Sequence, residues 1–340
     1  MSRQDKIDFI KQRFPSLNVE QKIALFEARN PGHLFNVDAL INENPSFYTI
    51  RMGYVCNERC IHCFTEDKKP SAHDRSLADL KQAIDEAPPE TTIIVVTGGE
   101  PTVRPELAEV LDYIRLRGCI NNVQTNGVKL GDSTYFEHIA PYLDSVFMPV
   151  HSADPAIHDQ ITQLTGSWES TITGVRRLVN AGIYLNTNTV INQLNYKGLV
   201  AIADLLQSIQ PGMPMTFTFP HPVGAAKSTA IVPRYTDVMP YLVSLLGKYG
   251  NLISTHYIPR CFLYPHQDLV INVDDGDNGS VHKPGVDFIN NNWEYTDYGE
   301  FKPYSKIKSS ACRACRFDSI CIGAWREYGE LYGVFDVIPR

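Results

Sequence analysis

The stretch SFYTIRMGYVCNERCIHC, residues 46–63, runs from a strand-like apolar pattern directly into three cysteines. These are Cys56, Cys60 and Cys63, in the spacing CxxxCxxC. A structural zinc ion is usually closed by four protein ligands, whereas a four-iron cluster held by three thiolates keeps one iron free for an outside ligand. The motif therefore favours an iron–sulfur cluster with one open position, and zinc remains the alternative on this motif alone.

Strand and helix patterns alternate along the chain that follows. Strands are expected at residues 47–55, 92–97, 121–126, 144–151, 183–191 and 214–220. Helical spacing of apolar residues fills the gaps at 76–87, 105–116, 133–140, 168–181 and 196–210. Six strands that alternate with helices predict a parallel sheet with right-handed crossovers, in the α/β class.

Short glycine-rich or polar motifs follow several of these strands. TGGEP (97–101) follows the second strand, QTNG (124–127) ends the third, His151-Ser152 ends the fourth, and Asn188 lies in the fifth. Paired glycines let the backbone approach a ligand closely, although a turn whose proline opens the next helix also explains TGGEP. Because the motifs share the carboxyl ends of strands, we expect them at the mouth of a barrel, where barrel active sites lie.

Taken together, these motifs resemble those of the radical S-adenosylmethionine (SAM) superfamily. The resemblance covers roughly residues 47–330 and implies a partial (β/α)6 TIM-type barrel. It implies that the three cysteines hold a [4Fe–4S] cluster whose open iron binds SAM. The residues implied to contact SAM are His62, Gly98, Gly99, Glu100, Pro101, Asn126, Ser152 and Asn188.

A second cysteine group lies near the C-terminus. Its members are Cys261, Cys312, Cys315 and Cys321. Four thiols are enough to close a metal site, and zinc fits this spacing too. The run resembles the Twitch or SPASM regions of radical SAM proteins, which implies an auxiliary [4Fe–4S] cluster. Only one is expected, because Trp325 stands four residues after Cys321, where a full SPASM region continues with cysteine ligands. Four cysteine ligands leave no iron open to substrate, which favours an electron-transfer role.

The composition describes a folded protein and limits its partners. The 340 residues are 43% apolar and 20% charged, and the net charge of −7 argues against a nucleic-acid surface. The N-terminus lacks the apolar core of a signal peptide, and no apolar run is long enough to cross a membrane. Eight cysteines without a secretory signal indicate metal ligation in a reducing, cytoplasmic setting.

Three domains are expected. Residues 1–46 form a helical N-terminal extension, 47–250 the radical SAM partial barrel, and 251–340 a small auxiliary-cluster domain. Within the last, NVDDGDNG (272–279) lacks the glutamate of a calcium loop, so a hairpin turn is expected there. Cys119, at the start of the third strand, is expected to be a buried, small apolar residue.

The resemblance implies that the reduced first cluster cleaves SAM to a 5'-deoxyadenosyl radical, which abstracts a hydrogen atom from a substrate C–H bond. With an electron-accepting second cluster, the expected reaction is the two-electron oxidation of a sugar or aminocyclitol, by a radical SAM oxidoreductase. The alternative is a maturase of ribosomally made peptides that forms a carbon–carbon or thioether crosslink or epimerises a residue. A reductant such as flavodoxin or ferredoxin is the expected partner.

Such an oxidation also needs a general base. The candidates are His221 and Glu66, and His221 is preferred because it follows the sixth strand and should point across the barrel. Further candidates at the mouth are Asp67, His73, Arg104 and His151. A non-enzymatic alternative is a zinc-stabilised binding protein that uses both cysteine groups structurally.

Overall fold

The computed structural model describes residues 3–13, 46–66, 74–88, 91–266, 306–319 and 323–333, three single residues (20, 23 and 321) and four short strands between 271 and 296. Some expectations lie outside these residues. They are the base candidates Asp67 and His73, most of the predicted N-terminal extension after residue 13, and most of the turn at 272–279.

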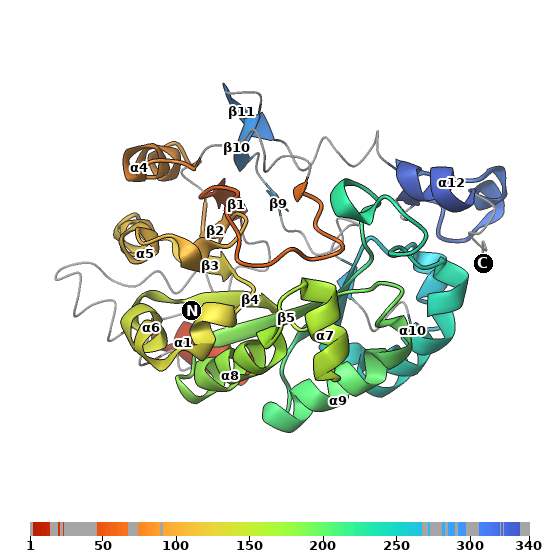
Figure 1. Ribbon diagram of the computed structural model, residues 1–340, viewed down its shortest axis with the longest axis horizontal. Helices are drawn as coiled ribbons and strands as arrows, with labels where there is room; N and C mark the ends of the chain where they lie inside the picture. Colours follow the sequence, from red (N-terminus) through yellow and green to blue (C-terminus); the bar gives the residue numbers. More distant parts are fainter. Residues whose placement is uncertain are drawn as a thin grey trace.

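Seven parallel strands form the centre of the fold. They are β1 (Ser46–Arg51), β2 (Ile93–Thr97), β3 (Ile120–Gln124), β4 (Ser145–Pro149), β5 (Tyr184–Val190), β6 (Met215–Thr218) and β7 (Ile253–His256). Each strand pairs in parallel with the next, and the sheet curls into a half-barrel (Figure 1). The predicted α/β partial barrel is confirmed, and β7 extends the sheet past residue 250 without having been predicted.

Short strands extend both edges of the sheet. On one side β8 (Ile271–Asn272) pairs in parallel with β7. On the other, β9 (Val281–His282) and β10 (Gly285–Ile289) pair in parallel with β1, and β11 (Asn292–Thr296) pairs in antiparallel with β10. Strands β8 and β9, on either side of the expected turn, pair with different strands.

Helices cover the outer face of the sheet (Figure 1). The predicted ones are α4 (Leu77–Asp85), α5 (Leu107–Leu116), α6 (Ser133–Ile139), α8 (Ser167–Asn180) and α9 (Leu199–Ile209). Helix α1 (Arg3–Arg13) lies in the predicted N-terminal extension. Helices α7 (Pro155–Thr162) and α10 (Tyr235–Tyr249) were not predicted. None of the helices described here has both the length and the apolar character needed to span a bilayer.

The core lies between the sheet and these helices. Side chains alternate along each strand, so Val146, Met148 and Leu185 point outward and are buried. They belong to one apolar cluster with helix residues such as Val175 and Leu242. Burial of this single large cluster supplies the main stabilisation of the half-barrel.

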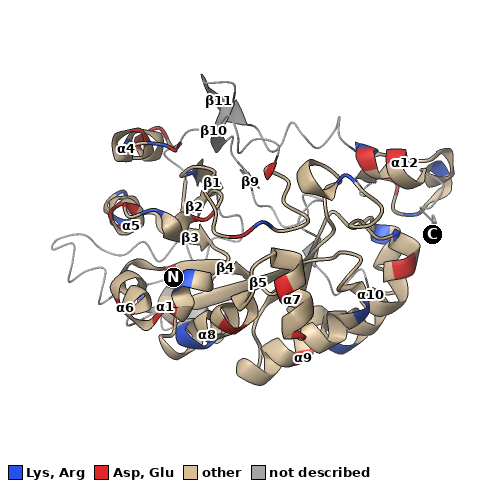
Figure 2. Ribbon diagram, viewed as in Figure 1, with Lys and Arg blue, Asp and Glu red and all other residues tan. Residues whose placement is uncertain are grey.

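The opposite, inner face of the sheet carries many polar side chains and no carboxylate, and Arg51 stands at the end of β1. Its partly exposed side chains include Asn122, Gln124, Asn186, Asn188 and Thr218. In strands β1 to β7 there is no aspartate, glutamate or lysine. The charged residues gather on helices and loops instead (Figure 2).

The C-terminal segment packs on the end of the barrel. Strand β12 (Lys306–Ile307) pairs in antiparallel with β13 (Ala324–Trp325), which leads into α12 (Arg326–Tyr332). The ring of Tyr328 lies 4.4 Å from that of Tyr235, and the Tyr235 N–H donates to the Tyr328 hydroxyl at 3.0 Å. Aromatic packing thus joins α12 to the start of α10.

Candidate functional site

The cysteine loop lies between β1 and α4. All three of its cysteines are partly exposed: Cys56, Cys60 and Cys63. The loop rests on the last turn of α7, because the Arg59 N–H donates to the Thr162 carbonyl at 3.0 Å and the Ile61 N–H to the Ile161 carbonyl at 2.9 Å. Helix α7, which was not predicted from the sequence, therefore supports the cysteine loop through these two backbone hydrogen bonds.

The glycine turn after β2 packs against the backbone that enters this loop. The Gly99 N–H donates to the Gly53 carbonyl at 2.9 Å. A Cβ atom at Gly99 would lie 2.3 Å from the Val55 oxygen and 2.4 Å from the Tyr54 oxygen, and one at Gly98 would lie 2.9 Å from the Gly53 oxygen. The close approach that these glycines permit is thus an approach to protein backbone, whereas the sequence analysis expected a ligand.

Glu100 links parts of the site by hydrogen bonds to Thr102, Thr125 and Asn126. Its buried carboxylate accepts hydrogen bonds from the Thr102 N–H (2.8 Å) and hydroxyl (2.6 Å), the Thr125 hydroxyl (2.6 Å) and the Asn126 N–H (2.6 Å). Burial raises the pKa of Glu100, and these hydrogen bonds act in the opposite direction. Asn126 in turn donates from Nδ2 to Asn57 Oδ1 at 2.7 Å, inside the cysteine loop. Glu100 therefore fixes the loop through Asn126.

The remaining predicted SAM-contacting residues also follow strands of the half-barrel or end them. Pro101 opens the short 3-10 helix η2 (Pro101–Val103), as the structural explanation of TGGEP predicts. The Ser152 hydroxyl accepts from the Asp154 N–H at 2.9 Å, and Asn188 Oδ1 accepts from the Thr218 hydroxyl at 2.7 Å. Contacts of these residues with SAM stay a prediction.

Three histidines lie beside the cysteine loop: His151 and His158 are buried, and His62 is partly exposed. The ring centroids of His62 and His151 are 4.7 Å apart, and those of His151 and His158 are 5.7 Å apart. Burial lowers the pKa of His62 and of His158 to about 4, and that of His151 well below its usual value. Nδ1 of His62 and Nδ1 of His151 are buried, and within the described chain neither has a hydrogen-bond partner. The site therefore contains two neutral imidazole rings, each with an Nδ1 atom that has no hydrogen-bond partner among the described residues.

Glu58, in the middle of the cysteine loop, is a site residue that the sequence analysis missed. Its side chain is 3% exposed, and its Oε2 accepts a hydrogen bond from the Cys60 thiol at 3.2 Å. Burial raises the pKa of Glu58 to about 8, and the charge of Glu100 acts in the same direction. Nothing in the sequence signalled this burial, because a glutamate in a loop is ordinarily exposed.

The second cysteine group comes together in space. One cavity is lined by Cys261, Cys312, Cys315 and Cys321, with Ile307, Lys308 and Gly323 among its other lining residues. Cys261 lies in the short 3-10 helix η8 (Arg260–Phe262) and is 5% exposed. Burial and the three neighbouring thiols raise its pKa to about 12. The distant Cys261 thus joins the other three, which supports its predicted membership of a four-ligand site.

The donor set of both groups fits iron–sulfur clusters. A tetrahedral zinc ion needs every sulfur within about 2.3 Å of one point, whereas a four-iron cluster places each thiolate on a separate iron. In the part of the chain that the structure describes, no three His, Cys, Asp or Glu side chains are gathered around a point as a single ion requires.

The predicted base His221 makes its contacts with the C-terminal segment. Its ring stacks on Trp325, with centroids 3.8 Å apart and planes at 14°, and Nε2 lies 3.2 Å from Glu327 Oε2. Burial lowers the pKa of His221, and Glu327 opposes that effect. These contacts differ from the expected orientation across the barrel. Glu66, the other candidate, is partly exposed at the end of the cysteine loop.

Arg104 and Cys119, two further residues named from the sequence, contact other parts of the protein. Arg104 donates to the carbonyl oxygens of Met52 and Arg75, each at 2.7 Å. Cys119 is 8% exposed and lies in the apolar core, with its thiol 3.4 Å from the Thr91 carbonyl oxygen. Cys119 is therefore the buried small residue that was predicted.

Comparison with known proteins was made on sequence and on structure. Residues 50–206 match the radical SAM superfamily. The mycofactocin maturase MftC of Mycobacterium tuberculosis is 29% identical over 163 residues, which are 47% of this chain and 41% of MftC. A probable GTP 3',8-cyclase of Sulfurisphaera tokodaii is 27% identical over 233 residues, 66% of this chain and 71% of that protein. The match thus spans less than half the length of MftC.

Two solved structures share the fold. SuiB of Streptococcus suis, solved with its precursor peptide SuiA, has a TM-score of 0.60 at 15% identity, over 86% of this chain and 75% of SuiB. The protein anSMEcpe, solved with AdoMet and a peptide, has a TM-score of 0.58 at 15% identity, over 83% of this chain and 90% of that one. At these identities the likeness concerns the fold alone.

Proposed function

The chain belongs to the radical SAM superfamily through residues 50–206, and from this premise we propose that it is a maturase of ribosomally made peptides. It is a radical SAM enzyme, and its family implies one [4Fe–4S] cluster and SAM. A sugar or aminocyclitol was the substrate expected from the sequence, and neither MftC nor SuiB supports that expectation. The maturase alternative has support from MftC, named a mycofactocin maturase, and from the fold likeness to SuiB.

The observation that carries the proposal is that strands β1 to β7 of the half-barrel contain no carboxylate. An aminosugar or aminocyclitol presents ammonium groups, which a buried site pairs with carboxylates. Strands β1 to β7 supply none, although they supply the amides of Asn122, Asn186 and Asn188. A carboxamide both donates and accepts hydrogen bonds, as a peptide backbone does. The net charge of −7 gave the aminosugar its support, but the aspartates and glutamates coloured in Figure 2 lie on helices and loops and not on strands β1 to β7.

In this proposal each cysteine group holds a [4Fe–4S] cluster. Cys56, Cys60 and Cys63 hold the first, and the four-cysteine group holds an auxiliary one. With SAM bound, the first cluster supplies the 5'-deoxyadenosyl radical chemistry of the superfamily. Glu100 fixes the cysteine loop through Asn126, and the Nδ1 atoms of His62 and His151 would be available to hydrogen-bond the polar groups of SAM. A flavodoxin or ferredoxin is proposed as reductant, and Glu66 remains the proposed base.

The test is a search for the source of the abstracted hydrogen. The protein is incubated without oxygen with SAM, a reductant, and either a deuterated peptide library or a set of deuterated aminosugars. Deuterium in 5'-deoxyadenosine from the peptides, with a matching mass change in a peptide, is the expected result. Transfer from the aminosugars alone would overturn the maturase proposal. The matched control is the Cys56→Ala, Cys60→Ala, Cys63→Ala triple variant, in which no 5'-deoxyadenosine should form.

A further inference from the structure

The loop after β6, residues 219–226, touches the first cysteine site. The Ala225 N–H donates to the Cys63 carbonyl at 2.9 Å. Gly224 has a positive φ of 59°, and a Cβ atom there would lie 2.4 Å from the same carbonyl oxygen. Only glycine tolerates both the left-handed backbone and the close approach. This loop therefore fixes the backbone of the third cysteine of the CxxxCxxC motif.

The same loop touches the C-terminal segment through His221. The Val223 N–H donates to the His221 carbonyl at 2.7 Å, so His221 and the residues beside Cys63 belong to one compact turn. The stack on Trp325 and the contact with Glu327 use both the face and the edge of the His221 ring. The His221 side chain is 22% exposed, which leaves little of it to face a substrate.

Trp325 in turn adjoins the four-cysteine cavity from two directions. In the small sheet, Ala324 pairs with Ile307, which lines the cavity, as does Gly323. The ring of Tyr257, four residues before Cys261, lies 4.6 Å from the ring of Trp325. The two chain segments that carry the four cysteines therefore meet at Trp325.

We propose that His221 is a positioning residue whose stack on Trp325 fixes the loop 219–226, and with it the Cys63 backbone, relative to the four-cysteine site. The proposal rests on the proposed function only in that both cysteine groups hold clusters. Electron transfer between two clusters depends on a fixed separation, and this contact is a direct route by which the fold can maintain it. Because the stacking face of the ring carries this role, another aromatic side chain at position 221 should preserve it.

The experiment measures amide hydrogen exchange in the metal-free protein, so it does not depend on the reaction. In His221→Ala, the Ala225 amide and residues 56–63 should exchange roughly two- to tenfold faster, the size of effect expected from one lost aromatic pair. His221→Phe keeps the ring and should exchange like the unaltered protein. His138→Ala, an exposed histidine on α6, is the matched control and should change nothing at either segment.

The second readout is the ratio of peptide product to 5'-deoxyadenosine in the loaded enzyme. It should fall in His221→Ala and be preserved in His221→Phe. Unchanged exchange in His221→Ala would overturn the proposal, and loss of product in both variants with unchanged exchange would restore His221 as the base. If His221→Ala does not fold, His221→Leu keeps the volume without the stack and takes its place. Failure of the unaltered enzyme to modify any peptide would reject the maturase function and leave the exchange result standing.

Discussion

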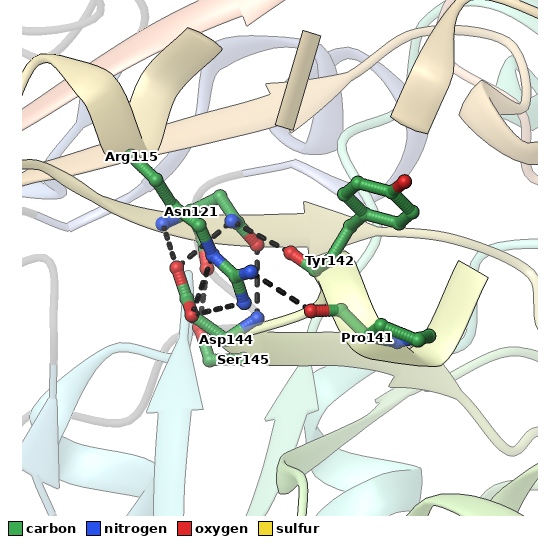
Figure 3. Close-up of polar contacts among 6 residues, drawn as sticks. All are labelled: Arg115, Asn121, Pro141, Tyr142, Asp144 and Ser145. Carbon is green, nitrogen blue, oxygen red and sulfur yellow. Dashed lines mark hydrogen bonds and ion pairs between the residues drawn. The ribbon is translucent and has the colours of Figure 1, made fainter. Parts of the chain in front are cut away.

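At the scale of single residues, one buried ion pair with many hydrogen bonds lies away from the candidate site, at the amino ends of β3 and β4. Arg115 donates from Nη2 to Asp144 Oδ1 at 2.7 Å and from Nη1 to the Pro141 carbonyl at 2.8 Å (Figure 3). Asp144 Oδ2 accepts from both nitrogens of Asn121, at 3.1 and 2.8 Å. Because every partner is hydrogen-bonded, this buried ion pair is a stabilising tie between α5 and two strands.

Asp144→Ala should lower the free energy of unfolding by about 3–5 kcal/mol, since it leaves Arg115 buried without its counter-charge. The measurement is urea denaturation of the metal-free protein. The control is Lys81→Ala, which removes an exposed ion pair with Glu109 and should cost at most about 1 kcal/mol. Equal costs for the two variants would show that the network at Asp144 is not a significant tie.

A second prediction about a single residue concerns Gly99→Ala. Its new methyl group would collide with the backbone of Tyr54 and Val55, so the chain that enters the cysteine loop must shift. We expect the iron content of the first site and the affinity for SAM to fall together, as measured by iron analysis and equilibrium dialysis. Gly198→Ala, which meets no atom within 4 Å, is the control. A Gly99→Ala protein that keeps its iron and loses only SAM would instead place the ligand against this glycine.

Among the elements, α7 does most to shape the site. Its last turn carries the cysteine loop, and Asp159 on it accepts hydrogen bonds from the Ser167 hydroxyl and the Trp168 N–H, both at 2.9 Å, at the start of α8. His158 faces inward, and its Nδ1 accepts from the His151 N–H at 3.3 Å. One short helix thus positions the loop, the next helix and the buried histidines.

This arrangement predicts a loss of stability in mild acid. Burial lowers the pKa of His158 to about 4 from an ordinary value of 6.5, so the unfolded chain takes up its proton first as the pH falls. The stabilisation is complete above about pH 6.5 and is lost as the pH falls toward 4. His62 and His151, whose pKa values burial also lowers, act in the same direction. Urea denaturation of the metal-free protein across this range should show the decline.

His158→Gln should make that decline shallower, because one of the buried titrating rings is gone. The exposed residue His138 provides the control variant His138→Ala, whose pH profile should match that of the unaltered protein. An identical slope in all three proteins would mean that His158 does not take part.

In the whole molecule, two cysteine sites belong to different parts of one fold, and aromatic packing joins those parts. The ring of Phe219, at the end of β6, lies 3.9 Å from that of Tyr235 and 5.8 Å from that of Tyr328 on α12. The Tyr332 hydroxyl donates to the Val232 carbonyl at 2.7 Å. The C-terminal segment is therefore packed on the barrel through buried contacts.

The protein reconstituted without oxygen should hold about eight iron atoms per chain, because two four-iron clusters are proposed. Replacing Cys56, Cys60 and Cys63 with alanine should remove about half of this iron and abolish SAM cleavage. Cys261→Ser should make the second cluster labile and slow product formation, while SAM cleavage continues. Iron analysis and assay of 5'-deoxyadenosine measure both effects.

Cys119→Ala is the control for all of these cysteine variants. It should keep its iron and activity and cost on the order of 1 kcal/mol in packing, because the thiol is buried in the apolar core. Zinc as the only bound metal would contradict the cluster assignment. Full iron and full turnover in Cys261→Ser would contradict the closed, electron-transferring second cluster.

The sequence by itself predicted the six strands from β1 to β6, the helices α4, α5, α6, α8 and α9, and the radical SAM motif, because periodicity and cysteine spacing are local properties of the chain. Helix α7 was missed although a local signal was present. Asp154 caps it through the Ala156 N–H at 2.8 Å, and Pro155 stands at its first position, a common helix start. The sugar substrate was inferred from net charge, which says nothing of where the charges lie.

Only the tertiary structure decided which distant residues meet. It brought Cys261 to the other cysteines of its group, pressed Gly99 against Tyr54, and turned His221 onto Trp325. It also buried Glu58 beside the Cys60 thiol. The contacts of Cys261, Gly99 and His221 join separate elements of the fold. The burial of Glu58 depends on the residues that pack against the cysteine loop. Such contacts are set by the closure of the sheet and the packing of helices upon it, and no pattern within a single segment encodes them.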